Sequence, residues 1–253
     1  MNQTITITYG ESVENHVGNQ QIGEKVDQGI SYTELQNIEK KLSKKYTCEL
    51  IDLKSFLDTK YHTETPDAGI LIVRNFVGTF FKRKTASSIM FDELSQLTWD
   101  TKALMRGKVV NKHARYNLCF ADFAQDPKYE DGKGRVYDFK DLKKLDEIRK
   151  FLEKLVGESL NAEGNYYYDT KKCYISFHGD AERFIVCGVR FGADFPLYYQ
   201  WYKNYESISD AKKISLSSGD LYIMSDKAVG CDWKRKIVPT LRHAAGEASQ
   251  PSK

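Results

Sequence analysis

The last part of the chain most constrains the fold, because short apolar or aromatic runs alternate there with turn residues. Each run is too short for an ordinary helix, and several are rich in the β-branched and aromatic residues that favour strands. The runs are Cys173–Phe177, Phe184–Gly192, Leu197–Tyr202, Ile214–Leu216, Leu221–Met224 and Ile237–Leu241. Strands at such spacing predict a sandwich or barrel, and we expect a jelly-roll core over residues 161–246.

Helices are predicted before that core, which makes the expected fold class α+β. Ser31 followed by Glu34 is a helix-start signal, and apolar residues then recur at helical spacing as far as Leu42. Residues 141–156 have the clearest amphipathic pattern, and Gly157 ends it. Further elements are expected at residues 50–57 (helix), 91–105 (helix) and 70–73 (buried strand).

Residues 1–30 are predicted to form an N-terminal arm. They begin with the strand-like alternation Ile5-Thr6-Ile7-Thr8 and continue as a polar stretch with spaced glycines. Nothing in them resembles a targeting peptide. We therefore expect one domain over residues 31–246, with helices and a lid to about residue 160, followed by a flexible tail at 247–253.

The composition points to a soluble intracellular protein, cytoplasmic or nuclear. Of 253 residues, 41% are hydrophobic and 29% charged, which permits one sizeable core. Five scattered cysteines without a CxxC pair argue for a reducing compartment and against a zinc module. No apolar run is long enough to cross a bilayer, so we expect no membrane partner.

Residues 80–116 contain the most basic stretch of the chain. Its cations and rings alternate in a way that suits a nucleic-acid backbone and its bases. An ordinary solvated surface explains the same residues equally well, and the net charge of only +3 gives no independent support. DNA or RNA binding through this segment is one of two interpretations. The residues are Lys82, Arg83, Lys84, Arg106, Lys108, Lys112, His113 and Arg115, with Phe80, Phe81, Trp99 and Tyr116.

A candidate metal site begins at His178-Gly179-Asp180. The pair ends an apolar run, and side chains two residues apart on a strand project to the same side. Joined by a distant second histidine, such a pair forms the two-His-one-carboxylate set that binds Fe(II) and leaves positions open. Surface loops also contain this triplet without any chemical role.

Further motifs surround the triplet in a fixed order: Asn165-Tyr166-Tyr167 upstream, then Phe191-Gly192-Ala193, Gly219-Asp220-Leu221, Trp233 and Leu241–Gly246 downstream. This ordered set resembles the AlkB-like branch of the Fe(II)- and 2-oxoglutarate-dependent dioxygenases. The resemblance covers roughly residues 66–246. The set is far more specific than any one of its motifs.

The resemblance implies roles for individual residues. His178 and Asp180 match the first two iron ligands, and Asn165 and Tyr167 match the residues that bind 2-oxoglutarate. The remaining matches concern substrate: Glu182 and Arg183 fit the charged pair after the His-x-Asp, and Arg115 and Tyr116 loosely fit the lid. Tyr199 and Trp201 are candidates to line the pocket, although core packing explains such rings as well.

The third iron ligand is where the sequence departs from the family pattern. His243 is the only later histidine that can complete the set, yet Arg242 can also be aligned with the arginine that binds the far carboxylate of 2-oxoglutarate. Neighbours on a strand face opposite ways, so both roles together are not expected. We favour His243 as ligand, with Arg190, or less well Arg235, holding the carboxylate.

The implied function is that of an Fe(II)- and 2-oxoglutarate-dependent oxygenase that uses O₂ to hydroxylate or demethylate a nucleic-acid base. One alternative is a protein or small-molecule hydroxylase on the same core. Another is a non-catalytic jelly-roll binding module, which is favoured if Arg242 rather than His243 faces the cavity.

Overall fold

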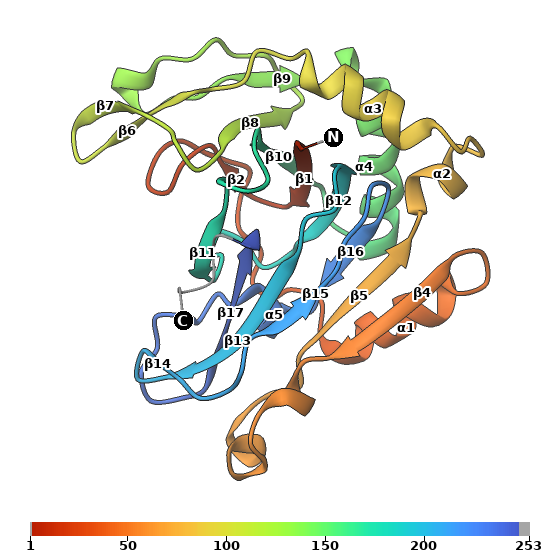
Figure 1. The fold of residues 1–253 in the computed structure, drawn as a ribbon, viewed down its shortest axis with the longest axis vertical. Helices are drawn as coiled ribbons and strands as arrows, with labels where there is room; N and C mark the ends of the chain where they lie inside the picture. The colour runs from red at the N-terminus through yellow and green to blue at the C-terminus, as the bar shows by residue number, and fades with distance from the viewer. Residues whose placement is uncertain (1, 248–253) are drawn as a thin grey trace.

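Two β-sheets account for most of the structure, and a few helices cover the outer face of the larger one (Figure 1). The computed structural model describes residues 2–247. The chain is a mixed protein of α-helices and β-strands in which strands predominate, as the sequence predicted. All neighbouring strands of the two sheets pair antiparallel except β8 and β9, which are parallel.

The first sheet has eight strands. In spatial order they are β4 (Thr47–Asp52), β5 (Gly69–Arg74), β16 (Leu221–Met224), β12 (Cys187–Gly192), β1 (Thr4–Gly10), β10 (Asn161–Tyr167), β8 (Tyr116–Ala121) and β9 (Val136–Asp138). The second sheet contains β11 (Ile175–His178), β17 (Thr240–Ala245), β13 (Leu197–Lys203) and β14 (Glu206–Ser207), with β15 (Lys212–Ile214) paired to β13. Two small hairpins join β2 (Val13–Glu14) to β3 (Gln21–Ile22) and β6 (Lys102–Met105) to β7 (Lys108–Asn111).

Five α-helices and four 3₁₀ turns connect the strands of the described chain. The α-helices are α1 (Tyr32–Leu42), α2 (Phe76–Phe80), α3 (Ala86–Ser95), α4 (Lys143–Val156) and α5 (Asp226–Val229). The 3₁₀ turns are η1 (Lys54–Phe56), η2 (Thr59–Glu64), η3 (Tyr129–Asp131) and η4 (Phe139–Asp141). The capping box predicted at Ser31 and Glu34 begins α1, and Gly157, with φ of 84°, ends α4. Both helix boundaries read from the sequence are therefore confirmed.

The N-terminal strand β1 lies in the middle of the larger sheet, which corrects the prediction of an arm. It pairs with β10 on one side and with β12 on the other. Ile5, Ile7 and Tyr9 point into the core under the helices, whereas Thr6 and Thr8 face the second sheet. Strands from both halves of the chain thus share one sheet, so residue 160 does not separate two structural units.

A second core fills the space between the two sheets. Alternation on β5 sends Ile70 and Ile72 into it and Leu71 and Val73 toward the helices, so this strand is apolar on both faces. From the second sheet, Tyr199, Trp201 and Leu241 pack into the same core. Each such buried apolar side chain stabilises the fold by about 1.5–3 kcal/mol.

Two predicted helices are wrong. Residues 47–52 form the strand β4, which pairs along its whole length with β5, and only the short turn η1 follows. Helix α3 ends at Ser95, and β6 occupies residues 102–105. In both places, pairing with a partner strand prevails over local helical periodicity.

Other expectations concern the cysteines, the membrane and the chain end. All five cysteines are free thiols. Within residues 2–247, no helix has the length and apolarity needed to cross a bilayer. The predicted tail lies outside the described residues except for Glu247, which accepts a hydrogen bond from the Tyr198 hydroxyl.

Candidate metal centre

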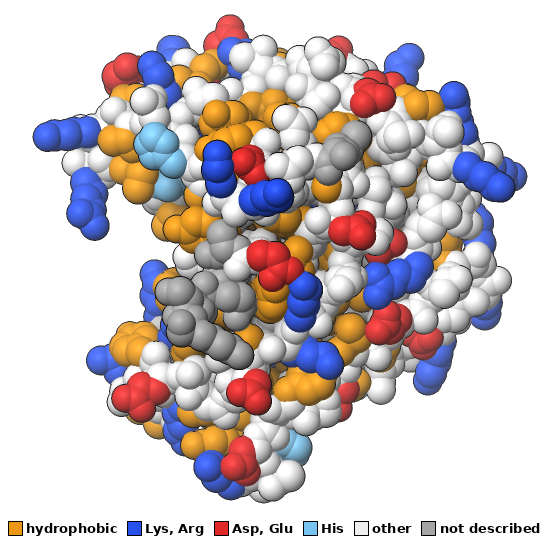
Figure 2. Space-filling view, in the orientation of Figure 1, with side chains coloured by type: hydrophobic (Ala, Val, Ile, Leu, Met, Phe, Trp, Pro, Cys, Tyr) orange, Lys and Arg blue, Asp and Glu red, His pale blue; other side chains and the backbone are white. Residues whose placement is uncertain are grey.

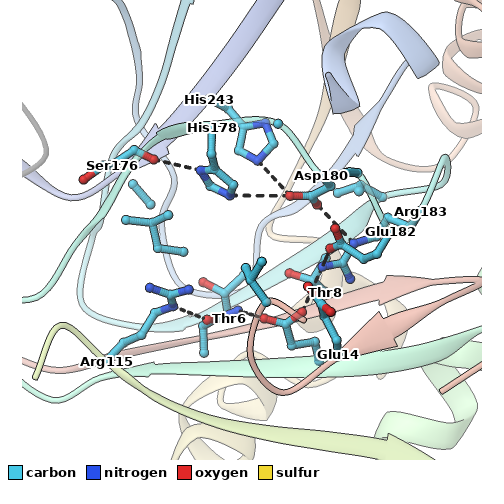
Figure 3. Close-up of a pocket in the computed structure, with 18 of the residues that line it drawn as sticks. Thr6, Thr8, Glu14, Arg115, Ser176, His178, Asp180, Glu182, Arg183 and His243 are labelled. Atoms are coloured by element: carbon cyan, nitrogen blue, oxygen red, sulfur yellow. Dashed lines mark hydrogen bonds and ion pairs between the residues drawn. The ribbon is translucent and has the colours of Figure 1, made fainter. Parts of the chain in front are cut away.

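His178, Asp180 and His243 form a compact cluster between the sheets (Figure 3). Strands β11 and β17 pair antiparallel with His178 opposite His243, so both imidazoles project to the same side. The Nε2 atoms of His178 and His243 lie 3.4 and 3.5 Å from the same Oδ1 atom of Asp180. One potential ligand atom from each residue lies within 4.8 Å of the others, so the three residues could hold a metal ion.

Gly179 allows the chain to bring Asp180 back toward the histidines. A Cβ at this position would lie 2.1 Å from the carbonyl oxygen of Gly230, which is a severe overlap. The backbone N–H of Asp180 donates to the carbonyl of Val229 at 3.0 Å. The turn after α5 therefore fixes the segment that carries the carboxylate.

Arg183 compensates the charge of Asp180 on the side away from the histidines. Its Nε atom lies 3.1 Å from Asp180 Oδ2, and its Nη2 atom lies 2.8 Å from Glu163 and 2.6 Å from Glu182. Burial alone would raise the pKa of Asp180, but Arg183 and the two histidines hold that pKa well below its usual range. Asp180 is therefore ionised, as metal binding requires.

Both histidines direct their Nε2 atoms toward the cluster. The Nδ1 atom of His178 lies 2.8 Å from the carbonyl oxygen of Ser176, which can only accept, so the ring proton resides on Nδ1. Burial and the neighbouring His178 lower the pKa of His243, which favours its neutral form. Neutral imidazoles beside a carboxylate are the donor set that suits Fe(II) and similar divalent ions.

A cavity of about 750 Å³ extends from this cluster toward the larger sheet. Its walls come from β1, β10, β11 and β12 and from the loop after β2. Figure 3 shows Thr6 and Arg115 across the cavity from the histidines. Figure 2 shows the molecule hollowed on the side where β11 and the β2–β3 hairpin lie.

Arg190 supplies an uncompensated positive charge to this cavity. It is only 1% exposed, its Nη1 donates to the Thr6 hydroxyl, and its Nε atom has no hydrogen-bond partner among residues 2–247. Asp220, whose backbone pairs with that of Arg190, directs its carboxylate to Arg74 at 2.9 Å instead. Burial lowers the pKa of Arg190, because no carboxylate of the described chain pairs with it. A buried guanidinium in this state could accept an anionic group as its partner.

Asn165 is engaged by the protein itself. Its Oδ1 accepts from Arg115 Nε at 2.7 Å and from Asn117 Nδ2 at 2.8 Å, and its Nδ2 donates to Glu163 at 3.0 Å. Asn165 therefore orients Arg115, which also lines the cavity. Tyr167 lines it too, with its ring centroid 4.4 Å from that of Phe195.

The remaining predicted site residues divide into two groups. Glu182 and Arg183 line the cavity, and three carboxylates already compensate the charge of Arg183. Tyr199 and Trp201 are buried core residues outside the cavity lining, and the indole N–H of Trp201 donates to Leu53. Their assignment as substrate contacts is corrected, because apolar side chains between the sheets cover both rings and neither ring lines the cavity.

Arg242 and His243 face opposite sides of β17, as alternation requires. His243 lines the cavity, whereas Arg242 lies on the outer face, with its guanidinium carbon 4.1 Å from the Tyr202 ring centroid. Arg242 is therefore not placed to bind a cosubstrate in the cavity. Of the two other arginines considered for the carboxylate, Arg190 lines the cavity and Arg235 is exposed on a loop.

The basic segment 80–116 does not form one surface. Trp99 is buried, Lys112 donates to Asn15 and Asn117, and Arg115 lines the cavity. Tyr116 stacks on Tyr168 with ring centroids 4.6 Å apart, outside the cavity lining. The exposed cations of the segment are split between the β6–β7 hairpin and the residues before α3.

Several cavity residues were not predicted from the sequence. Thr6 and Thr8 belong to a strand that the sequence did indicate, but nothing local showed that this strand pairs with β12. Glu163 precedes the Asn-x-Tyr motif by two residues, a spacing that places it on the same face as Asn165. The loop from Glu14 to Gly18 also contributes, and burial and Glu182 raise the pKa of Glu14 to about 7.

Fold and site together define a class: a two-sheet protein with a candidate His-Asp-His metal centre in an internal cavity. No family model matches the chain. The chain is 47% identical over 246 residues to uncharacterized protein R156 of Acanthamoeba polyphaga mimivirus, and the match covers 96% of each protein. The chain belongs to the same family as this viral protein.

Proposed function

We propose that this protein is an Fe(II)- and 2-oxoglutarate-dependent oxygenase of the AlkB-like type. One observation carries the proposal: the three candidate metal ligands and a buried, unpaired guanidinium line the same cavity. A dicarboxylate that binds a divalent metal through one end needs a positive group for its other end in the same cavity. The order of sequence motifs around His178 supports the same conclusion.

His178, Asp180 and His243 would hold the iron. Their donor types fit Fe(II), and the ion pair with Arg183 keeps Asp180 charged and oriented. When bound, the iron and 2-oxoglutarate together supply the oxidising chemistry that activates O₂. The protein contributes the ligand set and a cavity between the sheets in which the substrate can be held away from bulk water.

Arg190 would bind the far carboxylate of 2-oxoglutarate. Its guanidinium has donors left over after the bond to Thr6, and the Thr6 hydroxyl can donate its own proton to the same carboxylate. Tyr167 and Asn165 lie in the same wall, although Asn165 acts by holding Arg115. Replacement of water by these fixed donors is what makes a buried anion site favourable.

The proposed jelly roll would place the carboxylate-binding arginine on a different strand from the one that carries His243. In a jelly roll of eight strands, the last strand lies between the first and the third strands of one sheet. If β10, β11 and β12 are the first three strands and β17 the seventh, the position of the eighth belongs to β1, which pairs with both β10 and β12. The N-terminal strand would thus close the core, and the carboxylate-binding arginine would come from β12.

The substrate we propose is a nucleic-acid base whose alkyl group or C–H bond is oxidised. Support comes from the motif resemblance and from a cavity large enough for a base beside the cosubstrate. A hydroxylase acting on a protein or small molecule would use the same centre. The non-catalytic alternative required Arg242 in the cavity, and this position belongs to His243 instead.

Anaerobic addition of Fe(II) and 2-oxoglutarate tests the proposal. We expect the weak visible charge-transfer band of a metal-bound 2-oxo acid, which His178→Ala abolishes. Arg190→Met should keep the metal but raise the 2-oxoglutarate concentration needed for half of the band by about 100-fold, the effect of losing a charge-assisted bidentate contact worth about 3 kcal/mol. Absence of the band in the wild-type protein, together with no succinate formation under air, would end the proposal.

Succinate formation then identifies the substrate class. Methylated oligonucleotides should stimulate it, and peptide pools should not. Stimulation by peptides alone would remove the nucleic-acid assignment and leave the oxygenase assignment standing.

A further inference from the structure

A second basic and aromatic surface adjoins the mouth of the cavity. We call it the platform and define it as residues 233–237 together with the β13–β14 turn at Asn204 and Tyr205. Lys234, Arg235, Lys236 and Ile237 are exposed, Ile237 to 85%. Trp233 and Lys234 also line the cavity, so the platform is continuous with the candidate metal site. The turn lies at the lower left of Figure 1.

Hydrogen bonds hold the platform in one conformation. The Asn204 backbone N–H donates to the carbonyl of Lys236 at 3.0 Å, and the Tyr205 hydroxyl donates to the carbonyl of Lys234 at 3.1 Å. Both bonds use the backbone of the loop and leave its cationic side chains exposed, with Lys236 Nζ 5.1 Å from the ring centroid of Tyr205. A surface fixed in this way loses little conformational entropy when it binds a partner.

Arg242 packs against the two aromatic rings of the platform. Its guanidinium carbon lies 5.3 Å from the ring centroid of Trp233 and 5.7 Å from that of Tyr205. The residue is 9% exposed, and its Nε atom has no hydrogen-bond partner among residues 2–247. Arg242 therefore adds a positive charge that no carboxylate of the described chain neutralises.

Tyr205 occupies a backbone conformation that costs energy. Asn204 and Tyr205 form a two-residue hairpin turn with φ of 51° and 67°, where glycine is normally preferred at the second position. A bulky residue at positive φ is strained, and such strain tends to persist at functional positions. The ring of Tyr205 is 49% exposed, so core packing does not account for its presence.

The charge of the platform is almost entirely of one sign. Four cations gather at Lys234, Arg235, Lys236 and Arg242, with Glu206 as the nearby acid in the turn. Asp232 does not offset them, because its carboxylate is 2.7 Å from Lys227. Like charges at this density repel each other, and a polyanionic partner would relieve that repulsion.

We propose that the platform binds single-stranded nucleic acid and leads it to the cavity. Phosphates would contact Arg235 and Lys236, and an unpaired base would stack on Tyr205, whose ring stands beside these cations. The role of substrate guide rests on the proposed oxygenase function, whereas the binding surface does not. This surface is separate from the basic segment at residues 80–116.

Fluorescence anisotropy with a labelled single strand of about 12 nucleotides tests the proposal, in the absence of iron and 2-oxoglutarate. The double variant Arg235→Gln/Lys236→Gln should weaken binding about tenfold and reduce the slope of log K against log salt concentration by about 1.4. The matched control Arg106→Gln/Lys108→Gln removes the same charges from the β6–β7 turn and should change affinity less than about threefold.

A third variant separates recognition from folding. Tyr205→Gly should weaken binding about fivefold, because it removes the stacking ring and the hydrogen bond to the carbonyl of Lys234. Its thermal stability should not fall by much, because glycine relieves the strain at positive φ. A structural role for Tyr205 predicts the reverse, a lower melting temperature with unchanged affinity.

Three results would overturn the proposal: no binding of the strand by the wild-type protein, an equal loss in the β6–β7 control, or equally good competition by poly-glutamate. The last result would identify an acidic protein as the partner. None of them affects the metal-dependent absorption band, so failure of the platform and failure of the oxygenase assignment are distinguishable.

Discussion

Replacing His243 with alanine should abolish stabilisation by divalent metal, while replacing its neighbour Arg242 should preserve it. His243 contributes one of three candidate ligands, with Nε2 3.5 Å from Asp180 Oδ1. Arg242 is next to it in the chain but packs against Tyr202 and Trp233 on the other face of β17. The pair of variants tests the direction of two adjacent side chains.

The size of the effect follows from linkage between binding and folding. At a metal concentration 100 times the dissociation constant, the wild-type protein gains about 2.7 kcal/mol of unfolding free energy. For a domain of this size each kcal/mol raises the melting temperature by about 2–4 °C, so the metal should raise it by roughly 5–10 °C. Loss of one ligand that weakens affinity about 100-fold leaves about 0.4 kcal/mol at the same concentration, or roughly 1 °C.

Differential scanning fluorimetry of EDTA-treated protein titrated with Mn²⁺ or Co²⁺ measures this shift. Both residues are buried, so either substitution can lower the stability of the metal-free protein. Each variant is therefore compared with its own metal-free form. If the His243→Ala protein shifts as much as the wild type, this histidine is not a ligand. If the Arg242→Ala protein instead loses the metal-induced rise in melting temperature, the face of β17 that carries Arg242 is the one that faces the metal.

Three further predictions follow from the surroundings of the site. Arg183→Met should cost about 3–5 kcal/mol of unfolding free energy in urea denaturation, because three carboxylates lose their shared cation; a cost below about 1 kcal/mol would contradict this. Gly179→Ala should reduce the metal-induced thermal shift, since its Cβ would overlap the Gly230 carbonyl at 2.1 Å, and an unchanged shift would refute that packing. Burial lowers the pKa of Lys112 to about 8 from 10.5, so the folded state binds fewer protons than the unfolded state between these values. Relative to Lys112→Gln, wild-type stability should therefore rise by about 1.4 kcal/mol per pH unit across that window and be pH-independent below it; a flat difference would argue against burial of the charge.

Local patterns in the sequence predicted the elements that depend on hydrophobic periodicity and on helix capping. The capping box of α1, the amphipathic face and glycine end of α4, and the strand at Leu221–Met224 lie where these patterns placed them. These features need only the chain's nearest neighbours along the sequence. His178 and Asp180 do lie on one side, but Asp180 is beyond the end of β11, and contact with Val229 and Gly230 rather than strand spacing places it.

Contacts between distant segments could not be read from the sequence. Strand β1 was recognisable as a strand, yet only the folded chain inserts it between β10 and β12 and so brings Thr6 to Arg190. Tyr199 is an aromatic residue with a polar tip. It lies opposite His243 on the neighbouring strand, and the packing of the apolar side chains around it decides that it belongs to the core beside the cluster rather than to the cavity lining.

The candidate metal site shows the same division. The sequence by itself supplied His178-Gly179-Asp180 and left His243 and Arg242 as competing candidates to complete the site. The antiparallel register that sets His178 opposite His243 decided between them, because it fixes which face of β17 looks into the cavity. Register between strands about 60 residues apart is a property of the whole fold, since each pairing must satisfy the burial of every other strand at once.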